Sequence, residues 1–398
     1  MEKLKYNFDE IINRINTNSV KWDFNKELLG YENVISMWIA DMDFKTVPEV
    51  TEAIIERANH GIYGYSERTD SYFQSIINWM KNRHDLDISK EWIFSTSGII
   101  PALNLMIKAF SEPGDKIIVQ SPVYYQFYNA IKNNDCEILS NPLELKNGRY
   151  FMNFEDLEEK AKDPKVKIMI LCNPQNPTGT VWSIQDLVKL GEICIRNDVL
   201  IISDEIHCDL IYKNFKFKSF ASISEKFREN SIICTAPSKT FNLAGLQVSN
   251  LIIANKELRN KLETVVNKVG LKRINIFGII ACDAAYTYGE LWLDELIEYL
   301  DGNIKFLENF ILERIPKLKV NQTEGTYFVW IDCRALNMNN QELKKFMLSK
   351  AGVAFDEGFI FGTEGEGFQR INIACPRAIL KEALERIEKA VNSICLIK

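Results

Sequence analysis

The chain has 398 residues, of which 46% are hydrophobic and 26% are charged, and its formal net charge is −6. This composition is typical of a globular protein, and with no basic excess and no charged tail we expect no nucleic-acid partner. Because a single hydrophobic core rarely grows beyond about 250 to 300 residues, this length predicts two domains.

Cysteine usage and the N-terminal segment predict the compartment. The nine cysteines form no C-x-x-C pair, and several lie inside apolar runs, which indicates reduced packing residues. Residues 1–6 lack the apolar stretch of a signal peptide, and no window approaches the ~18 apolar residues of a membrane span. We therefore expect a cytoplasmic protein that makes no membrane contact.

Short apolar runs alternate with helical patterns through the first three quarters of the chain. They predict strands over residues 92–95, 117–120, 168–171, 199–203, 231–235 and 251–254. Continuously apolar runs are typical of a mostly parallel sheet covered by helices on both faces. The expected fold class is therefore α/β.

Residues 290–314 carry apolar side chains at every third or fourth position, which predicts a long amphipathic helix that braces two lobes. Beyond it, the patterns predict strands over 326–331 and 369–374, and helices over 340–350 and 377–392. This part of the chain is typical of a smaller α+β domain.

Polar clusters follow five of the predicted strands. They begin at Thr96, Ser121, Cys172, Asp204 and Ser238. In an open α/β sheet, ligands bind beyond the carboxyl ends of the strands, so we expect these clusters to converge on one site.

Lys239 and Asp204 are the two residues whose chemistry indicates a cofactor most directly. Lys239 follows a buried strand within small and apolar residues, where desolvation favours a neutral, nucleophilic amine; a surface lysine on a loop is the alternative. Asp204 ends another strand, where a buried carboxylate needs a cation; the alternative is a helix N-cap. Pyridoxal phosphate enzymes need this couple, a lysine that forms a Schiff base and a carboxylate that keeps the pyridine nitrogen protonated.

Three other clusters suit a flat phosphorylated ligand. The turn at Ser97, Gly98 and Ile99 opens a helix whose N–H groups bind phosphate, although an ordinary strand-to-helix turn is the alternative. Tyr124 offers a ring face, unless it is a core aromatic. Asn176 offers an amide donor, unless it only closes its proline-bracketed turn.

Two more residues complete the candidate set. His207 follows Asp204 by three residues, so its side chain is expected to point to the same side as that of Asp204. The pair His207-Cys208 lacks the spacing of metal ligands, so no metal is expected. The planar guanidinium of Arg370 suits a substrate carboxylate, with a solvated salt bridge as the alternative. The glycines of residues 362–367 precede a strand rather than a helix, which argues against a nucleotide motif.

These residues resemble the fold-type I pyridoxal phosphate enzymes, the aspartate aminotransferase superfamily. Within it, the chain is similar to the PatB/MalY group of cystathionine β-lyases and cystalysin-type cysteine desulfhydrases. The resemblance extends from about Asp9 to the C-terminus, and its signatures lie at residues 37–44, 60–65, 173–179, 203–207 and 236–246.

The resemblance implies a large domain over residues 51–288 and a smaller one built from both chain ends, residues 1–50 and 289–398. It implies Lys239 as the Schiff-base lysine and Asp204 as the partner of the pyridinium. The further cofactor-binding residues that it implies are Ser97, Gly98, Ile99, Tyr124, Asn176, His207 and Ser238, with Tyr65 from the neighbouring subunit of a homodimer. The substrate-binding residues that it implies are Arg370, Ala40 through its backbone, and Tyr125.

The chain departs from the wider aminotransferase pattern at two positions. The arginine common eight residues after the lysine is Gln247, and the serine common three residues before it is Ala236. A bound phosphate would then depend more on backbone N–H groups and hydroxyls. The cofactor would bind less tightly by roughly 1.5 to 3 kcal/mol, the contribution of one charged hydrogen bond. The β-lyase-like group also lacks that arginine, so the difference supports the subgroup.

The resemblance therefore implies a carbon–sulfur β-lyase that cleaves cystathionine, cysteine or cysteine S-conjugates to a thiol, pyruvate and ammonia. An aminotransferase acting on an amino acid is one alternative, because it uses the same lysine and carboxylate. A lyase with an additional regulatory binding role, as in one member of the MalY group, is the other.

Overall fold

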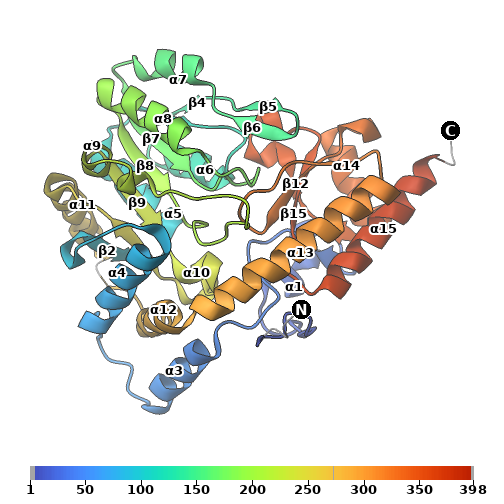
Figure 1. Ribbon diagram of the computed structural model, residues 1–398, viewed down its shortest axis with the longest axis horizontal. Helices are drawn as coiled ribbons and strands as arrows, with labels where there is room; N and C mark the ends of the chain where they lie inside the picture. The colour runs from blue at the N-terminus through green and yellow to red at the C-terminus, as the bar shows by residue number, and fades with distance from the viewer. Residues whose placement is uncertain (1–4, 272, 396–398) are drawn as a thin grey trace.

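The computed structural model describes residues 5–271 and 273–395 (Figure 1). Residues 1–4, which belong to the segment used for the cytoplasmic prediction, lie outside the described residues. None of the described helices is long and apolar enough to cross a membrane. The eight cysteines from Cys136 to Cys375 are all buried, and none of them forms a disulfide bond.

A seven-stranded sheet forms the centre of the larger part of the molecule. Its strand order is β2-β10-β9-β8-β7-β3-β4, and every pairing is parallel except those of β10, which is antiparallel to both neighbours. The mostly parallel α/β sheet predicted from the sequence is confirmed. The strands are β2 (Ile93–Thr96), β3 (Lys116–Val119), β4 (Glu137–Ser140), β7 (Val166–Cys172), β8 (Leu200–Asp204), β9 (Ser231–Thr235) and β10 (Ser249–Ile252).

Helices cover both faces of this sheet, which explains why its central strands read as continuous apolar runs. Side chains of one face pack with α5 (Ile99–Phe110), α6 (Tyr125–Asn133) and α11 (Lys256–Val269). The other face packs with α4 (Asp70–His84), α7 (Phe154–Ala161), α8 (Ile184–Arg196) and α12 (Ile276–Tyr288). The short helices α9 (Glu225–Glu229) and α10 (Pro237–Thr240) flank β9.

A second, four-stranded antiparallel sheet has the order β11-β12-β15-β14. The parallel pairing of Ile35 with Val353 brings the two ends of the chain together beside it. The smaller α+β part is therefore built from both ends, as expected, while the boundaries at residues 50 and 288 stay a prediction. Its elements are α1 (Val20–Asp23), α2 (Asn25–Leu29), β1 (Ile35–Ser36), β11 (Lys319–Val320), β12 (Phe328–Asp332), α14 (Asn340–Phe346), β13 (Val353–Ala354), β14 (Asp356–Glu357), β15 (Phe368–Asn372) and α15 (Arg377–Cys395).

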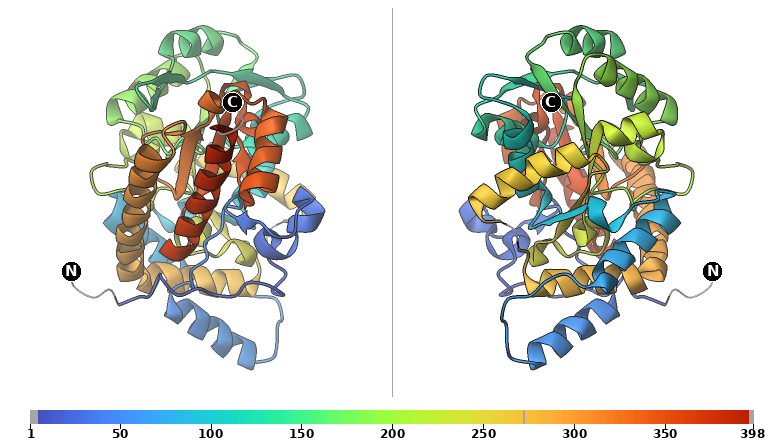
Figure 2. Two further views of the ribbon diagram at one scale, coloured as in Figure 1. Left: turned by 90° about the vertical axis from the view of Figure 1, so that its right-hand side faces the viewer. Right: turned by 90° about the vertical axis from the view of Figure 1, so that its left-hand side faces the viewer.

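The long helix α13 (Glu290–Arg314) begins and ends at the predicted residues. It packs against α12 at its start and against α15 further along, so it joins the two parts of the molecule (Figures 1 and 2). The predicted helix over 340–350 is α-helical only to Phe346 and continues as a π-helical turn over Met347–Ala351.

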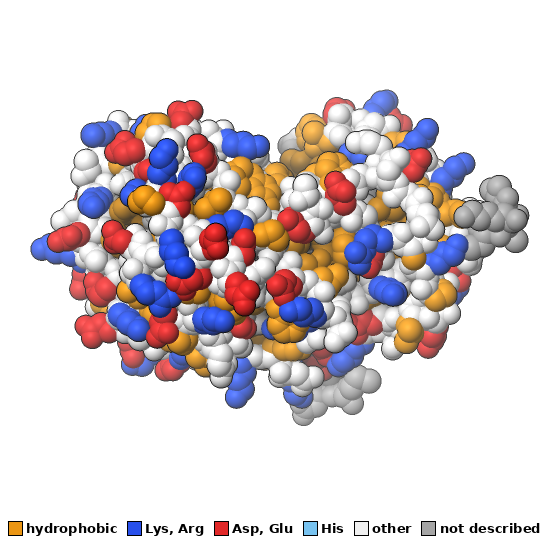
Figure 3. Space-filling view, turned by 90° about the horizontal axis from the view of Figure 1, so that it is seen from above, with side chains coloured by type: hydrophobic (Ala, Val, Ile, Leu, Met, Phe, Trp, Pro, Cys, Tyr) orange, Lys and Arg blue, Asp and Glu red, His pale blue; other side chains and the backbone are white. Residues whose placement is uncertain are grey.

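Two exposed features stand out from the body. Helix α3 (Pro48–Asn59) packs against α12, and with the loop after it projects from the lower end of the molecule (Figures 1 and 2). The hairpin of β5 (Glu144–Lys146) and β6 (Arg149–Phe151) lies at the opposite end. On the face in Figure 3, acidic and basic side chains are interspersed rather than gathered by sign.

Candidate active site

A cavity of about 210 Å³ lies where the strands β2, β7, β8 and β9 end. Ten of the residues singled out from the sequence line it: Ala40, Ser97, Gly98, Ile99, Tyr124, Asn176, Asp204, His207, Ser238 and Lys239. The predicted convergence of polar strand ends therefore occurs.

A second, wider hollow of about 720 Å³ adjoins the cavity and shares the residues Ala40, Tyr124 and Lys239 with it. Tyr125 and Arg370 line this hollow rather than the inner cavity. The arrangement separates an inner space for a fixed group from an outer space where an amino acid can enter.

Lys239 lies in the short helix α10, which begins with Pro237 at the position where a missing N–H costs nothing. The sequence did not indicate this short helix, and the alternative of a surface lysine on a loop is wrong, because Lys239 lines the cavity. Its Nζ donates a hydrogen bond to the carbonyl oxygen of Ala40 at 2.7 Å. Desolvation by the surrounding protein lowers the pKa of the Lys239 amine to about 8, although the Asp41 carboxylate opposes this shift. About a tenth of the amine is therefore neutral and nucleophilic at pH 7, far more than for an ordinary lysine.

Asp204 ends β8 with its carboxylate buried against the cavity. It accepts a hydrogen bond from the backbone N–H of Ile206 at 3.2 Å, and no helix follows it, so the alternative of a helix N-cap is wrong. Burial raises the pKa of Asp204 to about 7. A carboxylate in such a place is stabilised by a cation in the cavity, which would restore its charged form.

His207 also lines the cavity, but it lies in a turn rather than on a helix. Its ring meets those of Tyr327 and Phe328 edge-on, and its buried Nδ1 has no partner among the described residues. Burial holds the pKa of His207 well below its usual range, with further lowering by Lys239 and Arg370. His207 therefore offers a neutral imidazole with an unused nitrogen to a bound group.

The beginning of helix α5 forms one wall of the cavity. Gly98 is its N-cap, and the first N–H groups of the helix have no partner within the helix itself. Ser97 and Ser238 lie in the same lining. Helix N–H groups beside two hydroxyls favour phosphate binding.

Arg370 of β15 is buried and reaches across to the larger sheet. Its Nη1 donates to Oδ1 of Asn176 at 2.7 Å, and its Nη2 donates to the carbonyl of Trp38 at 3.2 Å and pairs with the Asp356 carboxylate. The alternative of a solvated salt bridge is wrong, because the pair is buried and the guanidinium lies 3.8 Å from the ring centre of Phe328. Its Nε has no partner among the described residues, so it can still bind another group.

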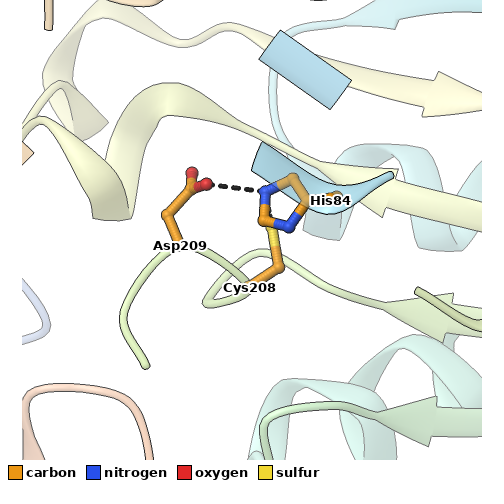
Figure 4. A group of neighbouring side chains, drawn as sticks. All are labelled: His84, Cys208 and Asp209. Atoms are coloured by element: carbon orange, nitrogen blue, oxygen red, sulfur yellow. Dashed lines mark hydrogen bonds and ion pairs between the residues drawn. The ribbon is translucent and has the colours of Figure 1, made fainter. Parts of the chain in front are cut away.

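A second cluster of polar side chains consists of His84, Cys208 and Asp209 (Figure 4), and it contacts α10 through Thr240. Their ligand atoms lie within 4.8 Å of one another, a grouping that the sequence did not reveal. Asp209 accepts hydrogen bonds from Trp79 at 3.0 Å, from His84 at 2.7 Å and from Thr240 at 2.6 Å.

This cluster is better explained as a support for α10 than as a metal site. Thr240 directly follows Lys239, so the Asp209 carboxylate anchors the helix that carries the lysine. Burial raises the pKa of the Cys208 thiol well above its usual range, and the thiol, unlike the thiolate, is a poor metal ligand. Burial opposes ionisation of Asp209 too, but His84 and the hydrogen bonds lower the pKa of that carboxyl.

Tyr65 is the one predicted site residue that the structure leaves outside both spaces. It lies in the loop after α3, it is 94% exposed, and the Arg273 guanidinium lies 4.8 Å from its ring centre. The residue has no role in the cavity of its own chain, so its predicted role depends on a second subunit.

Three residues that the sequence did not single out also shape the site. Tyr327 donates a hydrogen bond to the Ala40 carbonyl at 3.0 Å, while Asp356 and the Trp38 backbone hold Arg370. No sequence pattern indicated them, because each acts through a contact between distant segments.

The donors and acceptors of the cavity fit pyridoxal phosphate. Among the described residues the buried Asp204 carboxylate forms no ion pair and the His207 Nδ1 has no hydrogen-bond partner, and the Lys239 amine lines the same space. The start of α5 offers free N–H groups on the wall where a phosphate would lie. Gln247 and Ala236 line the cavity as well, so both departures from the wider family lie at the site.

Comparison with known proteins agrees with this geometry. The sequence matches the family described as aminotransferase class I and II over residues 32–387. It is 43% identical to the cystathionine β-lyase PatB of Bacillus subtilis, over 97% of this chain and all of that protein. It is 31% identical to the protein MalY of Escherichia coli, over 98% of this chain and all of that protein.

Solved structures give the same result for the fold. A pyridoxal-phosphate-bound putative aminotransferase from Clostridium difficile superposes with a TM-score of 0.95 at 46% identity, covering 97% of this chain and all of the other. Cystalysin from Treponema denticola, which contains pyridoxal 5′-phosphate, has a TM-score of 0.95 at 38% identity, covering 98% and 99% of the two chains.

Proposed function

The chain belongs to the aminotransferase class I and II family, and we propose that it is a pyridoxal-phosphate-dependent carbon–sulfur β-lyase. Its substrates are cystathionine, cysteine or cysteine S-conjugates, and its products are a thiol, pyruvate and ammonia. The observation that carries the proposal is the Lys239 amine and the Asp204 carboxylate facing one cavity, in a chain 43% identical to a cystathionine β-lyase.

The residues that would hold the cofactor divide by chemistry. Lys239 would bond to it covalently, Asp204 would keep its ring nitrogen protonated, and Tyr124 would offer an aromatic face to its ring. Asn176 and His207 would interact with its phenolate oxygen. Ser97, Gly98, Ile99 and Ser238 would hold the phosphate, with Tyr65 of a second subunit.

The bound cofactor supplies an electron sink for the electron pair released at the substrate Cα. Lys239 is placed to remove the Cα proton, and an amine whose pKa is about 8 accepts and releases a proton readily near neutral pH. The Cα–H and Cβ–S bonds break, and the sulfur leaves with a proton as the free thiol. In the overall reaction, one cystathionine and one water give one homocysteine, one pyruvate and one ammonia.

The outer hollow is where the amino acid enters. Arg370 is the cation for the substrate carboxylate, and its guanidinium is held in place by Asn176 and Asp356. The Ala40 backbone borders both spaces, and Tyr125 contributes a side chain to the outer one. Orientation of the carboxylate fixes the Cα–H bond relative to Lys239.

Transamination is the second candidate, because the Clostridium difficile structure at 46% identity is described as a putative aminotransferase. The same lysine and carboxylate serve both reactions. Incubation with an added 2-oxo acid separates them, since a transaminase converts that acid into an amino acid and a β-lyase releases pyruvate without it.

The test uses purified protein with pyridoxal phosphate and three substrates: cystathionine, cysteine and S-methylcysteine. We expect pyruvate and a free thiol from at least one of them, and no turnover by Lys239→Ala. Lys26→Gln, which changes an exposed lysine paired only with Glu32, is the control for the loss of one amine. An absence of pyruvate with all three substrates would overturn the lyase proposal.

The protein also acts as a cytoplasmic homodimer in this proposal. Tyr65, Ile62 and Tyr63 are exposed on the projecting loop after α3, where a second subunit would bury them. The eight buried, unpaired cysteines support a reducing compartment.

A further inference from the structure

A short segment, residues 38–44, lines the outer hollow and borders the inner cavity at Ala40, and we call it the Ala40 strip. The carbonyl oxygen of Ala40 accepts hydrogen bonds from the Lys239 Nζ at 2.7 Å and from the Tyr327 hydroxyl at 3.0 Å. Asn242 and Asn372 bind other backbone groups of the strip. The strip therefore contacts the reacting lysine and is held both to the segment after α10, through Asn242, and to β15 of the smaller sheet, through Asn372.

A charged lock from the N-terminal segment holds the other side of the strip. Arg14 donates two parallel hydrogen bonds to Asp41, at 3.0 and 2.9 Å, and a third to Asp43 at 2.7 Å. Lys21, which is 1% exposed, pairs with Asp43 at 2.8 Å, and the Trp22 indole donates to the same carboxylate at 2.9 Å.

The two carboxylates of the lock make different contacts. Asp43 is buried and satisfied by Lys21, Trp22 and Arg14, so it ties the N-terminal segment to the protein. Asp41 is 22% exposed, lines the outer hollow and takes the planar fork of Arg14. A bidentate pair of this kind fixes geometry as well as charge.

We propose that Arg14 is a positioning residue of the active site, which fixes the Ala40 carbonyl against Lys239 through Asp41 and neutralises the Asp41 charge beside that amine. The inference rests on the proposed function in taking Lys239 as the reacting amine. It adds the N-terminal segment, which lines the outer hollow at Arg14 but contributes no residue to the inner cavity.

The charges around the lysine set the expected direction of the effect. Burial lowers the pKa of Lys239, Asp41 and Asp204 raise it, and Arg370 lowers it. The charged and titratable groups that face or act on the amine are Asp41, Asp204, His207, Tyr124, Tyr327 and Arg370. Removing Arg14 leaves the Asp41 charge balanced only in part, by Lys21 at 3.6 Å, and so raises the Lys239 pKa, whereas removing the Asp41 charge lowers it.

Opposite shifts from the two partners are a signature that a merely structural role would not produce. In full-length protein freed of cofactor, the reactivity of the Lys239 amine towards an acylating reagent is measured against pH by mass spectrometry. We expect the midpoint to rise by roughly 0.5 pH unit in Arg14→Gln and to fall by a similar amount in Asp41→Asn. Lys26→Gln, which removes an exposed cation of the N-terminal region, is expected to leave it unchanged.

Arg14→Lys separates charge from geometry. The lysine keeps the positive charge but loses the planar guanidinium that donates two parallel hydrogen bonds. We therefore expect the pH midpoint of Lys239 labelling to stay near that of the wild type, while KM for the amino-acid substrate rises by roughly threefold or more. Far-ultraviolet circular dichroism and the melting temperature of each variant show that it is folded.

The labelling experiment does not depend on lyase turnover, so it can succeed even where the proposed reaction fails. Unchanged midpoints in both Arg14→Gln and Asp41→Asn, or shifts of the same sign, would overturn the inference. A pure loss of stability with unaltered Lys239 titration would overturn it too, since the lock would then be structural only.

Discussion

The side-chain oxygen of Asn176 accepts a hydrogen bond from Nη1 of Arg370 at 2.7 Å. This contact joins the turn after β7 to β15 of the second sheet, so it couples the two parts of the molecule at the site. Because Oδ1 serves Arg370, the amide N–H groups of Asn176 are left for the cavity. In the proposed function, these N–H groups would donate to the phenolate oxygen of the cofactor.

Replacing Asn176 by alanine removes both contacts at once. We expect KM for the amino-acid substrate to rise by about tenfold, since Arg370 loses an anchor worth ~1.5 kcal/mol, and cofactor affinity to fall by a similar factor. Steady-state kinetics and a cofactor titration measure the two effects. Asn129→Ala, which removes an amide bonded only to Gln126, is the control, and a change in neither quantity would contradict the coupling.

Asp204 and Glu205 form a matched pair for a pH experiment. Burial raises the pKa of both carboxyls to about 7, yet only Asp204 lines the cavity. In the range between about pH 4 and 7 the folded chain holds a proton that the unfolded chain has released, so stability falls as the pH rises through this window. Above pH 7 each carboxylate costs the cofactor-free protein up to about 4 kcal/mol.

We therefore expect Asp204→Asn and Glu205→Gln to raise the free energy of unfolding of the cofactor-free protein at pH 8 but hardly at pH 4.5. Only Asp204→Asn should weaken cofactor binding, by about 10- to 150-fold, because it removes the partner of the ring nitrogen. Urea unfolding at the two pH values and a cofactor titration check these outcomes. Equal stability of variant and wild type at pH 8 would show that the carboxyls are not destabilising.

The sequence predicted those elements whose physical signal is local. Strand β9 and helix α13 were located to the residue, because one has an apolar centre between two small polar residues and the other has a strong helical period. Edge strand β4, half-exposed, has no such signal, and the antiparallel direction of β10 is a property of pairing rather than composition. Among the site residues, those that follow strands were found, since parallel strand ends converge.

Contacts between distant segments were not predictable in this way. Arg14 meets Asp41 from a loop with no regular period, and Asp356 meets Arg370 from a strand of two residues. Each partner alone is an ordinary charged residue. Only the folded chain shows that these pairs border the site.

Substitutions of Gln247 test where and how strongly the cavity binds the cofactor phosphate. Gln247 lines the cavity in a left-handed backbone conformation with φ of 51°, a strain that another long side chain would share equally. Gln247→Arg should tighten cofactor binding by about 10- to 150-fold, the value of one charged hydrogen bond to a phosphate. Equilibrium dialysis measures the constant, with Gln247→Met as the uncharged control. Unchanged affinity in the arginine variant would place the phosphate elsewhere in the cavity.

Tyr65 provides the test of the assembly, since it is 94% exposed and outside both spaces of its own chain. If it completes the site of a second subunit, Tyr65→Ala and Lys239→Ala are each inactive alone but complement one another. In the hybrid dimer one site has Lys239 from the first chain and Tyr65 from the second, so a mixture that exchanges subunits freely recovers about a quarter of the wild-type activity. Recovery requires exchange, which native mass spectrometry of the mixture measures directly. Hybrids that form and remain inactive would mean that Tyr65 acts within its own subunit, and full activity of Tyr65→Ala alone would mean that the residue has no role at the site.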